Sequence, residues 1–294
     1  MGSNDLPVKK IYIDSKFRRH DSVSTSNFKI ELPYTLKLSD NTIFCVDDVC
    51  IPHTWYTIEA GVNDKLYVRT ILNSANTDYI LTLTAQNYSG SQLKAELEAK
   101  LQTLMFMSSA LVGSTVSYNS QTQKISLSIA GQFSHDCKIM TDAELKTVTN
   151  WGGIGTNTVQ SPYPTYDVNN LDSVNEILTN TGNVSTIGTT SIPVQFYLNL
   201  QPVRNVYMRS PNISSFNTIG CNGESSIIKK IPVSSNYGDM ILNNITSAND
   251  FLDCSKATWK TLEFHLLDVN SNYINLHGSN VSFSLILDKQ NLNQ

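Results

Sequence analysis

The stretch from Phe28 to Val68 constrains the fold most, because it predicts β-strands in direct succession and leaves no room for a helix. Phe28, Ile30 and Leu32 alternate with charged residues, the period of two that is typical of a half-buried strand. The run 43–51 is mostly apolar and β-branched, as in a strand that is covered on both faces. The chain is therefore predicted to be an all-β shell, and such shells more often bind or assemble than catalyse.

Proline is expected to end the first two of these strands, at Pro33 and Pro52. The segment that follows carries His53, Trp55 and Tyr56, three large amphipathic side chains. Side chains of this kind suit a sheet rim or a contact between subunits. These three residues are the candidate subunit interface.

Composition limits the classes of partner. Only 16% of the residues are charged, against about 25% in an average soluble domain, and Ser, Thr and Asn take their place. This favours either a β protein with many turns or a surface that neighbours cover, and the two are compatible. The net charge of −4 predicts no overall attraction to nucleic acid.

Residues 1–24 are predicted to form an N-terminal arm, either mobile in solvent or turned toward an assembly partner or packaged genome. The arm contains the only basic cluster of the sequence: Lys9, Lys10, Lys16, Arg18 and Arg19. Asp14 and Asp21 are interspersed, so the cluster is too dilute to neutralise many phosphates. Binding to nucleic acid is therefore not expected.

Five cysteines occur at spacings that match no metal or redox motif: Cys45, Cys50, Cys137, Cys221 and Cys254. Cys45 and Cys50 are five residues apart and should point to opposite faces of an extended strand, so they are not expected to form a disulfide. Reduced, buried thiols are predicted. The N-terminal region lacks the apolar core of a signal peptide, and no apolar run is long enough to span a membrane.

The middle of the chain changes period. Ser89 and Gln92 have the spacing of a capping box, and leucines at 93, 97, 101 and 104 then predict a helix over 90–106. A hairpin is predicted over 115–129. From 131 to 192 the composition is that of long loops, with short helices near 141–147 and 171–178. The interpretation is an insertion that projects from the β body.

Strand patterns return in the last third, at 194–200, 203–208, 226–233, 261–267 and 281–287. Strands near both ends with a helical excursion between them predict a roll whose first and last strands pair. The expected fold is all-β, a single jelly-roll β-sandwich with a mixed α+β insertion. The predicted boundaries are 25–85 with 193–294 for the jelly roll and 86–192 for the insertion. The alternative is two small β-domains divided near 150–190.

A search for chemistry finds no motif of a hydrolase, nucleotide-binding protein or zinc protease, so no enzyme, cofactor or metal is predicted. The sequence His135-Asp136-Cys137 is the nearest approach to a nucleophile, but neighbours in a strand point to opposite faces. Asp47-Asp48 with Asn63-Asp64 offers oxygen ligands for calcium, yet Asp47 and Asp48 should also point apart. Edge polarity and turn capping are the simpler interpretation.

Aromatic residues in the predicted loops are candidate ligand contacts, because aromatic rings can form a platform for sugars. They are Trp151, Tyr163 and Tyr166. Core packing or subunit contact is the alternative interpretation of the same residues.

Short motifs at both ends of the chain resemble the penton proteins of virophages and polinton-like viruses. The N-terminal motifs are Asp14-Ser15, Phe28-x-Ile30-x-Leu32-Pro33 and Val49-x-Ile51-Pro52-x-x-Trp55-Tyr56-x-Ile58. The C-terminal motifs lie at 227–233, 262–268, 274–278 and 281–285. Each motif is short, and their order along the chain is the stronger signal.

The resemblance implies a single jelly roll, five copies of which close each vertex of an icosahedral double-stranded DNA virus and contact the major capsid protein. It also implies a place in the virion after assembly in the host cytoplasm or nucleus, without secretion. The alternative function is a β module that binds a host receptor or glycan, like a fibre head. An enzyme on a β scaffold has no motif to support it.

Overall fold

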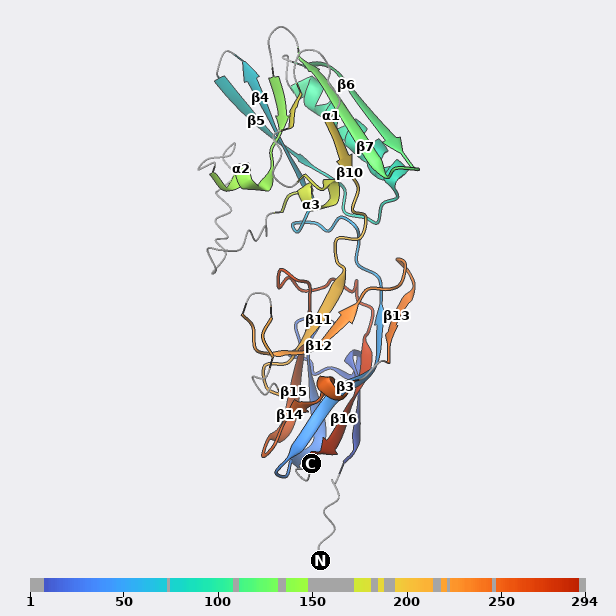
Figure 1. Cartoon of the computed structure of the whole chain (residues 1–294), viewed down its shortest axis with the longest axis vertical. Helices are drawn as coiled ribbons and strands as arrows, with labels where there is room; N and C mark the ends of the chain where they lie inside the picture. The colour runs from blue at the N-terminus through green and yellow to red at the C-terminus, as the bar shows by residue number, and fades with distance from the viewer. Residues whose placement is uncertain are drawn as a thin grey trace, which may run out of the picture. The chain divides into compact units, whose positions relative to one another are not determined.

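The computed structural model describes residues 8–72, 75–107, 111–131, 136–147, 172–180, 185–187, 194–213, 218–220, 223–244 and 247–290. The chain divides into two compact units, which Figure 1 shows with their strands labelled. One unit combines residues 1–55 with 203–294, and the other is the continuous segment 56–202. The second unit is therefore inserted in the sequence of the first, which does not fit the alternative of two domains divided near 150–190.

The first unit is a sandwich of two antiparallel sheets. Sheet A runs in the order β1 (Lys10–Asp14), β16 (Ser282–Lys289), β3 (Thr42–Pro52) and β13 (Met240–Asn243), and β14 (Leu252–Asp253) also pairs with β3. Sheet B runs in the order β12 (Ile227–Pro232), β11 (Asn205–Arg209), β15 (Thr258–Leu267) and β2 (Asn27–Lys37). Two short 3-10 helices occupy Ser15–Phe17 and Ala248–Asp250.

The first and last strands of the chain pair directly, with Lys10 opposite Ile286 and Asp14 opposite Ser282. This confirms the expectation that the two ends come together in one β body. The finding also corrects the prediction of an N-terminal arm over residues 1–24, because residues 10–14 form an edge strand of sheet A.

Aromatic side chains from both sheets fill the space between them. Phe264 of β15 packs against Phe28 of β2 at 5.6 Å between ring centroids and against Phe283 of β16 at 4.9 Å. Phe44 of β3 meets Trp259 of β15 edge-to-face. All five rings are buried, as the period-two patterns of their strands require.

A β-bulge interrupts β3 at Asp48. Ser282 lies opposite Cys50 while Ser284 lies opposite Asp47, so β3 contains one extra residue, and Asp48 takes a positive φ of 48°. The bulge shifts the alternation by one residue, from core positions 44 and 46 to core positions 49 and 51.

The shift corrects two sequence-based expectations. Cys45 and Cys50 lie on the same face of β3, not on opposite faces, because the extra residue lies between them. Asp47 and Asp48 both reach one cation: Lys10 Nζ donates to Asp47 Oδ2 at 3.2 Å and to Asp48 Oδ2 at 2.6 Å. A uniform strand would have directed these two carboxylates apart.

The strand β2 continues past Pro33, where the sequence predicted its end. Glu31 lies opposite Thr261 and Leu36 opposite Trp259, so residues 32–35 arch away from β15 before pairing resumes. Proline is tolerated here because β2 is an edge strand of sheet B. On the open side of an edge strand a backbone N–H has no strand partner, so the lack of an N–H in proline costs no hydrogen bond of the sheet.

Within its described residues, the second unit contains two further sheets and three helices. One sheet orders β5 (Ala75–Thr82), β4 (Lys65–Leu72), β8 (Asp136–Ile139) and β9 (Ser185–Ile187). The other orders β10 (Val194–Tyr197), β7 (Lys124–Gly131) and β6 (Leu111–Asn119), and β6 with β7 forms the predicted hairpin. The helices are α1 (Gly90–Met107), α2 (Asp142–Thr147) and α3 (Asn175–Leu178).

The helix α1 confirms the prediction for residues 90–106. The Ser89 amide donates to Gln92 Oε1 at 2.8 Å, and the Gln92 amide donates to Ser89 Oγ at 3.3 Å, which completes the capping box. The four leucines at 93, 97, 101 and 104 are buried in one core with strands of both sheets. Gly90 at the helix start lies close to the Tyr118 ring of β6: a Cβ there would be 2.1 Å from it, so a larger residue would have to displace the end of that side chain.

The cap gives a first prediction. Ser89→Ala is expected to lower the free energy of unfolding by about 1 kcal/mol, because it leaves the Gln92 amide without its side-chain acceptor. Chemical denaturation measures the change. Ser91→Ala is the matched control, because Ser91 is exposed and lies two residues later in the first turn of the helix. It should cost much less. Equal losses in the two variants would show that the capping box does not stabilise the helix.

Residues 56–85 belong to the second unit, whereas the sequence placed them in the jelly roll. β4 pairs with β5 and β8, and none of these three strands pairs with a strand of the sandwich. The alternating pattern of a short strand indicates that it belongs to a sheet, but the pattern does not indicate which sheet. The boundaries of the compact units are accordingly 55/56 and 202/203.

Candidate interaction surfaces

The predicted interface trio is mostly turned inward. His53 and Trp55 are buried, with ring centroids 4.3 Å apart, and only Tyr56 is partly exposed. His53 Nδ1 lies 2.9 Å from the Ser235 carbonyl oxygen, and its ring meets Tyr237 edge-to-face. His53 and Trp55 therefore hold the turn before β13 in place, which corrects their expected position on an outer contact surface.

Exposed apolar side chains occur instead at the two edges of sheet A. Met240 and Leu242 of β13 are exposed on one edge, and Tyr12 of β1 is exposed on the other. Tyr237, in the turn supported by His53, adds a further exposed ring next to β13. No sequence pattern singled these residues out, because β1 and β13 are too short to display a period.

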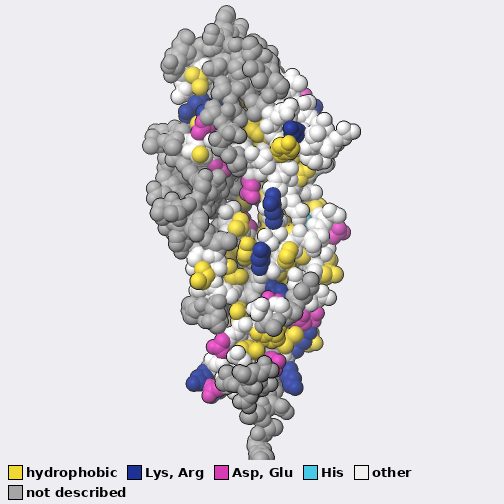
Figure 2. All heavy atoms as spheres, viewed as in Figure 1, with side chains coloured by type: hydrophobic (Ala, Val, Ile, Leu, Met, Phe, Trp, Pro, Cys, Tyr) yellow, Lys and Arg dark blue, Asp and Glu magenta, His cyan; other side chains and the backbone are white. Residues whose placement is uncertain are grey.

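The N-terminal basic cluster is largely compensated by acids. Besides the contacts of Lys10, Arg19 Nη1 donates to Glu31 Oε2 at 2.7 Å and Arg19 Nε donates to Asp21 Oδ1 at 3.0 Å. Arg18 Nη1 donates to the Ser15 carbonyl oxygen. In the face drawn in Figure 2, charged side chains are sparse among uncharged ones, in keeping with the composition.

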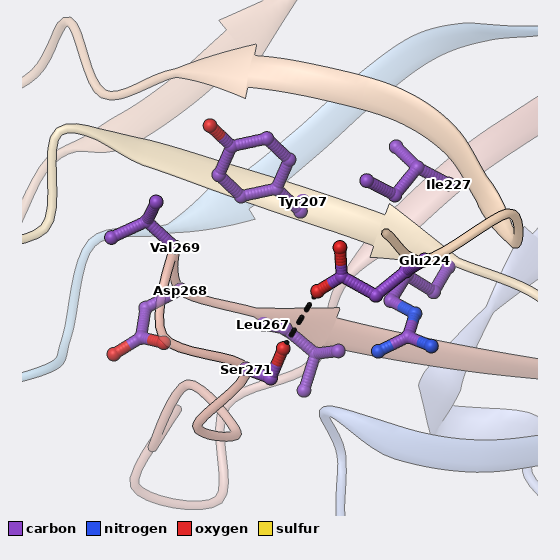
Figure 3. Close-up of a pocket in the computed structure, with 8 residues that line it drawn as sticks. Tyr207, Glu224, Ile227, Leu267, Asp268, Val269 and Ser271 are labelled. Carbon is purple, nitrogen blue, oxygen red and sulfur yellow. Dashed lines mark hydrogen bonds between the residues drawn. The ribbon is translucent and has the colours of Figure 1, made fainter. Parts of the chain in front are cut away.

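A shallow pocket lies on the outer face of sheet B (Figure 3). Residues of β11, β12 and β15 form its floor and two loops form its walls; the lining residues are Tyr207, Arg209, Glu224, Ile227, Leu267, Asp268, Val269 and Ser271. Ser271 Oγ donates to Glu224 Oε1 at 2.9 Å across the opening. The empty space is about 250 Å³, including open solvent, which suits one small polar group.

Asp268 has a structural role in one wall of this pocket. Its carboxylate accepts from the amides of Asn270 and Asn272, each at 2.8 Å, and from Asn272 Nδ2 at 3.0 Å. Burial raises the pKa of Asp268, and the hydrogen bonds from Asn272 and Asn270 oppose that rise. The pocket thus combines a fixed acidic loop with an arginine, a tyrosine ring and a hydroxyl.

The residues proposed for calcium are engaged in other ways. Asp47 and Asp48 both accept hydrogen bonds from Lys10. The side chain of Asn63 accepts a hydrogen bond from the Glu59 amide and donates one to the Thr57 carbonyl oxygen. Within the described residues, no three His, Cys, Asp or Glu side chains form a group that could hold a metal ion. No described helix has the length and apolar character that a membrane span needs.

The buried thiols among the described residues are expected to be poorly reactive. Burial raises the pKa of Cys45 to about 11 and the pKa values of Cys137 and Cys254 to about 12. A thiol of this kind is a weak nucleophile at neutral pH, which agrees with the structural interpretation of Cys137. His135, Cys221 and the three loop aromatics Trp151, Tyr163 and Tyr166 lie outside the described residues.

This burial predicts slow alkylation. In the native protein at pH 8, Cys45, Cys137 and Cys254 should resist iodoacetamide, whereas the more exposed Cys50 should react first among the four. Mass spectrometry of peptides after a short pulse of reagent measures each site, and a pulse in denaturant provides the control. Rapid native labelling of Cys137 would contradict the buried, protonated thiol.

Known proteins resemble this chain in structure and not detectably in sequence. No family model matches the chain, and no curated protein matches it. Among solved structures, a crystal structure of the mavirus penton protein is similar, with 10% sequence identity and a TM-score of 0.48 over 96% of this chain and 99% of that chain. At this identity and score, the likeness carries no inference about what this chain does.

Proposed function

We propose that this protein is a structural capsid protein that forms the vertices of an icosahedral virus as a pentamer. The observation that carries the proposal is the strand order of the sandwich. With β13 and β14 taken as one interrupted strand, sheet A contains the first, eighth, third and sixth strands of the unit, and sheet B the fifth, fourth, seventh and second. This is the order of an eight-stranded jelly roll, an architecture common in viral capsids.

The surface chemistry supports assembly. A closed ring needs one heterologous contact that repeats between neighbours, and it needs no catalytic group. The low charge of the chain and the exposed apolar residues at the sheet edges suit such contacts. The motifs that resemble pentons lie mostly in the sandwich unit, at 28–33, 49–58, 227–233 and 262–285.

The remaining parts of the proposal follow from the same role. The major capsid protein is the expected partner around the vertex, and the virion is the expected location. Residues 56–202 are the insertion in the jelly roll, with boundaries taken from the compact unit.

The mass of the purified protein tests the proposal. Light scattering or native mass spectrometry at tens of micromolar is expected to give five times the chain mass of 32.7 kDa. Electron microscopy of the particles should show five-fold rings. A strict monomer under these conditions that also fails to appear at the vertices of the virion would refute the vertex role.

Binding of a host receptor or glycan is a second candidate function, and the pocket on sheet B favours it. Tyr207 offers a ring, Arg209 offers donors, and the oxygens of Glu224 and Ser271 offer acceptors, a set that suits sugar hydroxyls. Glu224→Gln should reduce glycan-array binding at least tenfold, with Val23→Ala, on an exposed residue outside the pocket, as the control. Binding that survives Glu224→Gln would place any site elsewhere, where Trp151, Tyr163 and Tyr166 remain candidates.

A further inference from the structure

The two edges of sheet B are protected against pairing with another strand. At β2, the Arg19 amide donates to the Lys29 carbonyl oxygen and Ser22 Oγ accepts from the Lys29 amide, after which Pro33 and the arch of residues 32–35 distort the open side. Natural sheets use covering loops, prolines and bulges to prevent edge-to-edge association.

The opposite edge of sheet B uses the same devices. At β12, Thr218 Oγ1 donates to the Ile227 carbonyl oxygen at 2.7 Å, which covers the start of the strand. The exposed residues Lys230 and Pro232 follow, and the register with β11 is bulged between Met208 and Arg209. Charge, proline and bulge therefore all occur on this edge.

The β13 edge of sheet A has none of these devices within its described residues. The strand Met240–Asn243 contains neither charge nor proline, and it pairs with β3 in regular register. In an antiparallel pair, half of the N–H and C=O groups of an edge strand point away from its neighbour. Met240 is 46% exposed and Leu242 is 69% exposed, whereas Ile241 between them faces the core.

The β1 edge of the same sheet has a charged residue at each end, and both are engaged by other groups of the same chain. Lys10 is held by Asp47 and Asp48, and Asp14 accepts from the Lys16 amide. Tyr12 between them is 78% exposed. Among the described residues, no strand pairs with the outer side of β1 or β13, and both edges carry large exposed apolar side chains.

Register places these apolar residues on one face of sheet A. Asp14 lies opposite Ser282, Ser282 opposite Cys50, and Cys50 opposite Leu242. Residues that are directly opposite across neighbouring strands share a face, and residues two apart on one strand do as well. Tyr12 at one edge and Leu242 at the other therefore project to the same, outer side.

We propose that the β13 edge of one copy pairs with the β1 edge of the next copy, so that sheet A continues from subunit to subunit with Leu242 and Tyr12 in the contact. The inference rests on the proposed assembly and locates its repeating contact. A second copy is the occupant because the open edge of β13 needs another extended backbone, and because each chain carries both halves of a head-to-tail contact.

Substitutions at the two halves test this contact. Leu242→Lys and Tyr12→Lys each introduce the edge charge that protects β12, and each is expected to convert the assembly to monomers in light scattering. Val23→Lys, on an exposed residue that belongs to neither edge of sheet A, is the control and should keep the assembled mass. Circular dichroism spectra should be unchanged in all three, since the residues are exposed.

Mixing the two monomeric variants gives the sharpest readout. The Leu242→Lys chain retains an intact β1 edge and the Tyr12→Lys chain an intact β13 edge, so an equimolar mixture should form a one-to-one dimer and stop there. The dimer would also show that both variants are folded.

The possible failures are distinguishable. A monomeric wild type refutes the proposed assembly itself. An assembled wild type whose mass survives both Leu242→Lys and Tyr12→Lys refutes only the location of the contact. Loss of assembly in Leu242→Lys alone refutes the role of β1, and loss in Val23→Lys as well shows that the effect of charge is not specific to sheet A.

Discussion

Replacing Phe264 with alanine is expected to lower the free energy of unfolding of the β-sandwich unit by about 3–5 kcal/mol. The Phe264 ring is completely buried and contacts Phe28 on its own sheet and Phe283 on the other. Truncation removes the apolar surface that holds the two sheets together, and it leaves a cavity that three strands cannot close by small movements.

Urea denaturation measures this loss, with the fluorescence of Trp259, buried in the same core, as a signal from this unit. Thr258→Ala is the matched control, because Thr258 lies exposed on the same strand β15. It should cost less than about 1 kcal/mol. A loss for Phe264→Ala as small as that of the control would mean that the two sheets are not packed through this ring.

The second large effect is expected in the insertion. Leu97→Ala should lower the free energy of unfolding of residues 56–202 by about 2–5 kcal/mol, because Leu97 is completely buried between α1 and the strands. Glu98→Ala, the next residue, breaks a partly exposed i,i+4 ion pair with Lys94 and should cost about 0.3–0.5 kcal/mol.

Hydrogen exchange followed by mass spectrometry assigns each loss to its unit. Leu97→Ala should speed exchange in α1, β6 and β7, and Phe264→Ala should speed it in β2, β15 and β16. Equal effects of Leu97→Ala and Glu98→Ala would indicate that the leucine face of α1 is not a core face.

Prediction from the sequence was most accurate for elements whose determining residues all lie close together in the chain. For α1, the capping box, the leucine spacing and the flanking charges all lie within twenty residues, and the structure has the helix at Gly90–Met107. The hairpin β6–β7 and the strands β11, β12, β15 and β16 were also found within a few residues of their ends, because each alternates over several positions.

Elements that depend on distant partners were missed. β1, β13 and β14 are two to five residues long and exist because β16 and β3 offer them an edge. The bulge at Asp48 has no signature in the residues of β3 and appears only against the register of β16. Once it is present, Asp47 and Asp48 meet at Lys10, a contact that no uniform strand could make.

The buried positions of His53 and Trp55 could not be predicted for a related reason. His53 and Trp55 have the amphipathic character of contact residues, but that character also suits a buried ring pair with one hydrogen bond to a backbone carbonyl. Composition cannot distinguish the two environments. The exposed residues beside them, Met240 and Leu242, come from a segment almost two hundred residues later in the chain.

The pairing of β1 with β16 also sets an order of events during synthesis. Residues 10–14 leave the ribosome early, but their partner strand at 282–289 follows only after on the order of tens of seconds of translation. Until then β1 has no partner strand in a sheet, so the subunit contact proposed for it could not form. If that contact is the one used in assembly, a nascent chain could not join neighbouring copies before β16 has been made.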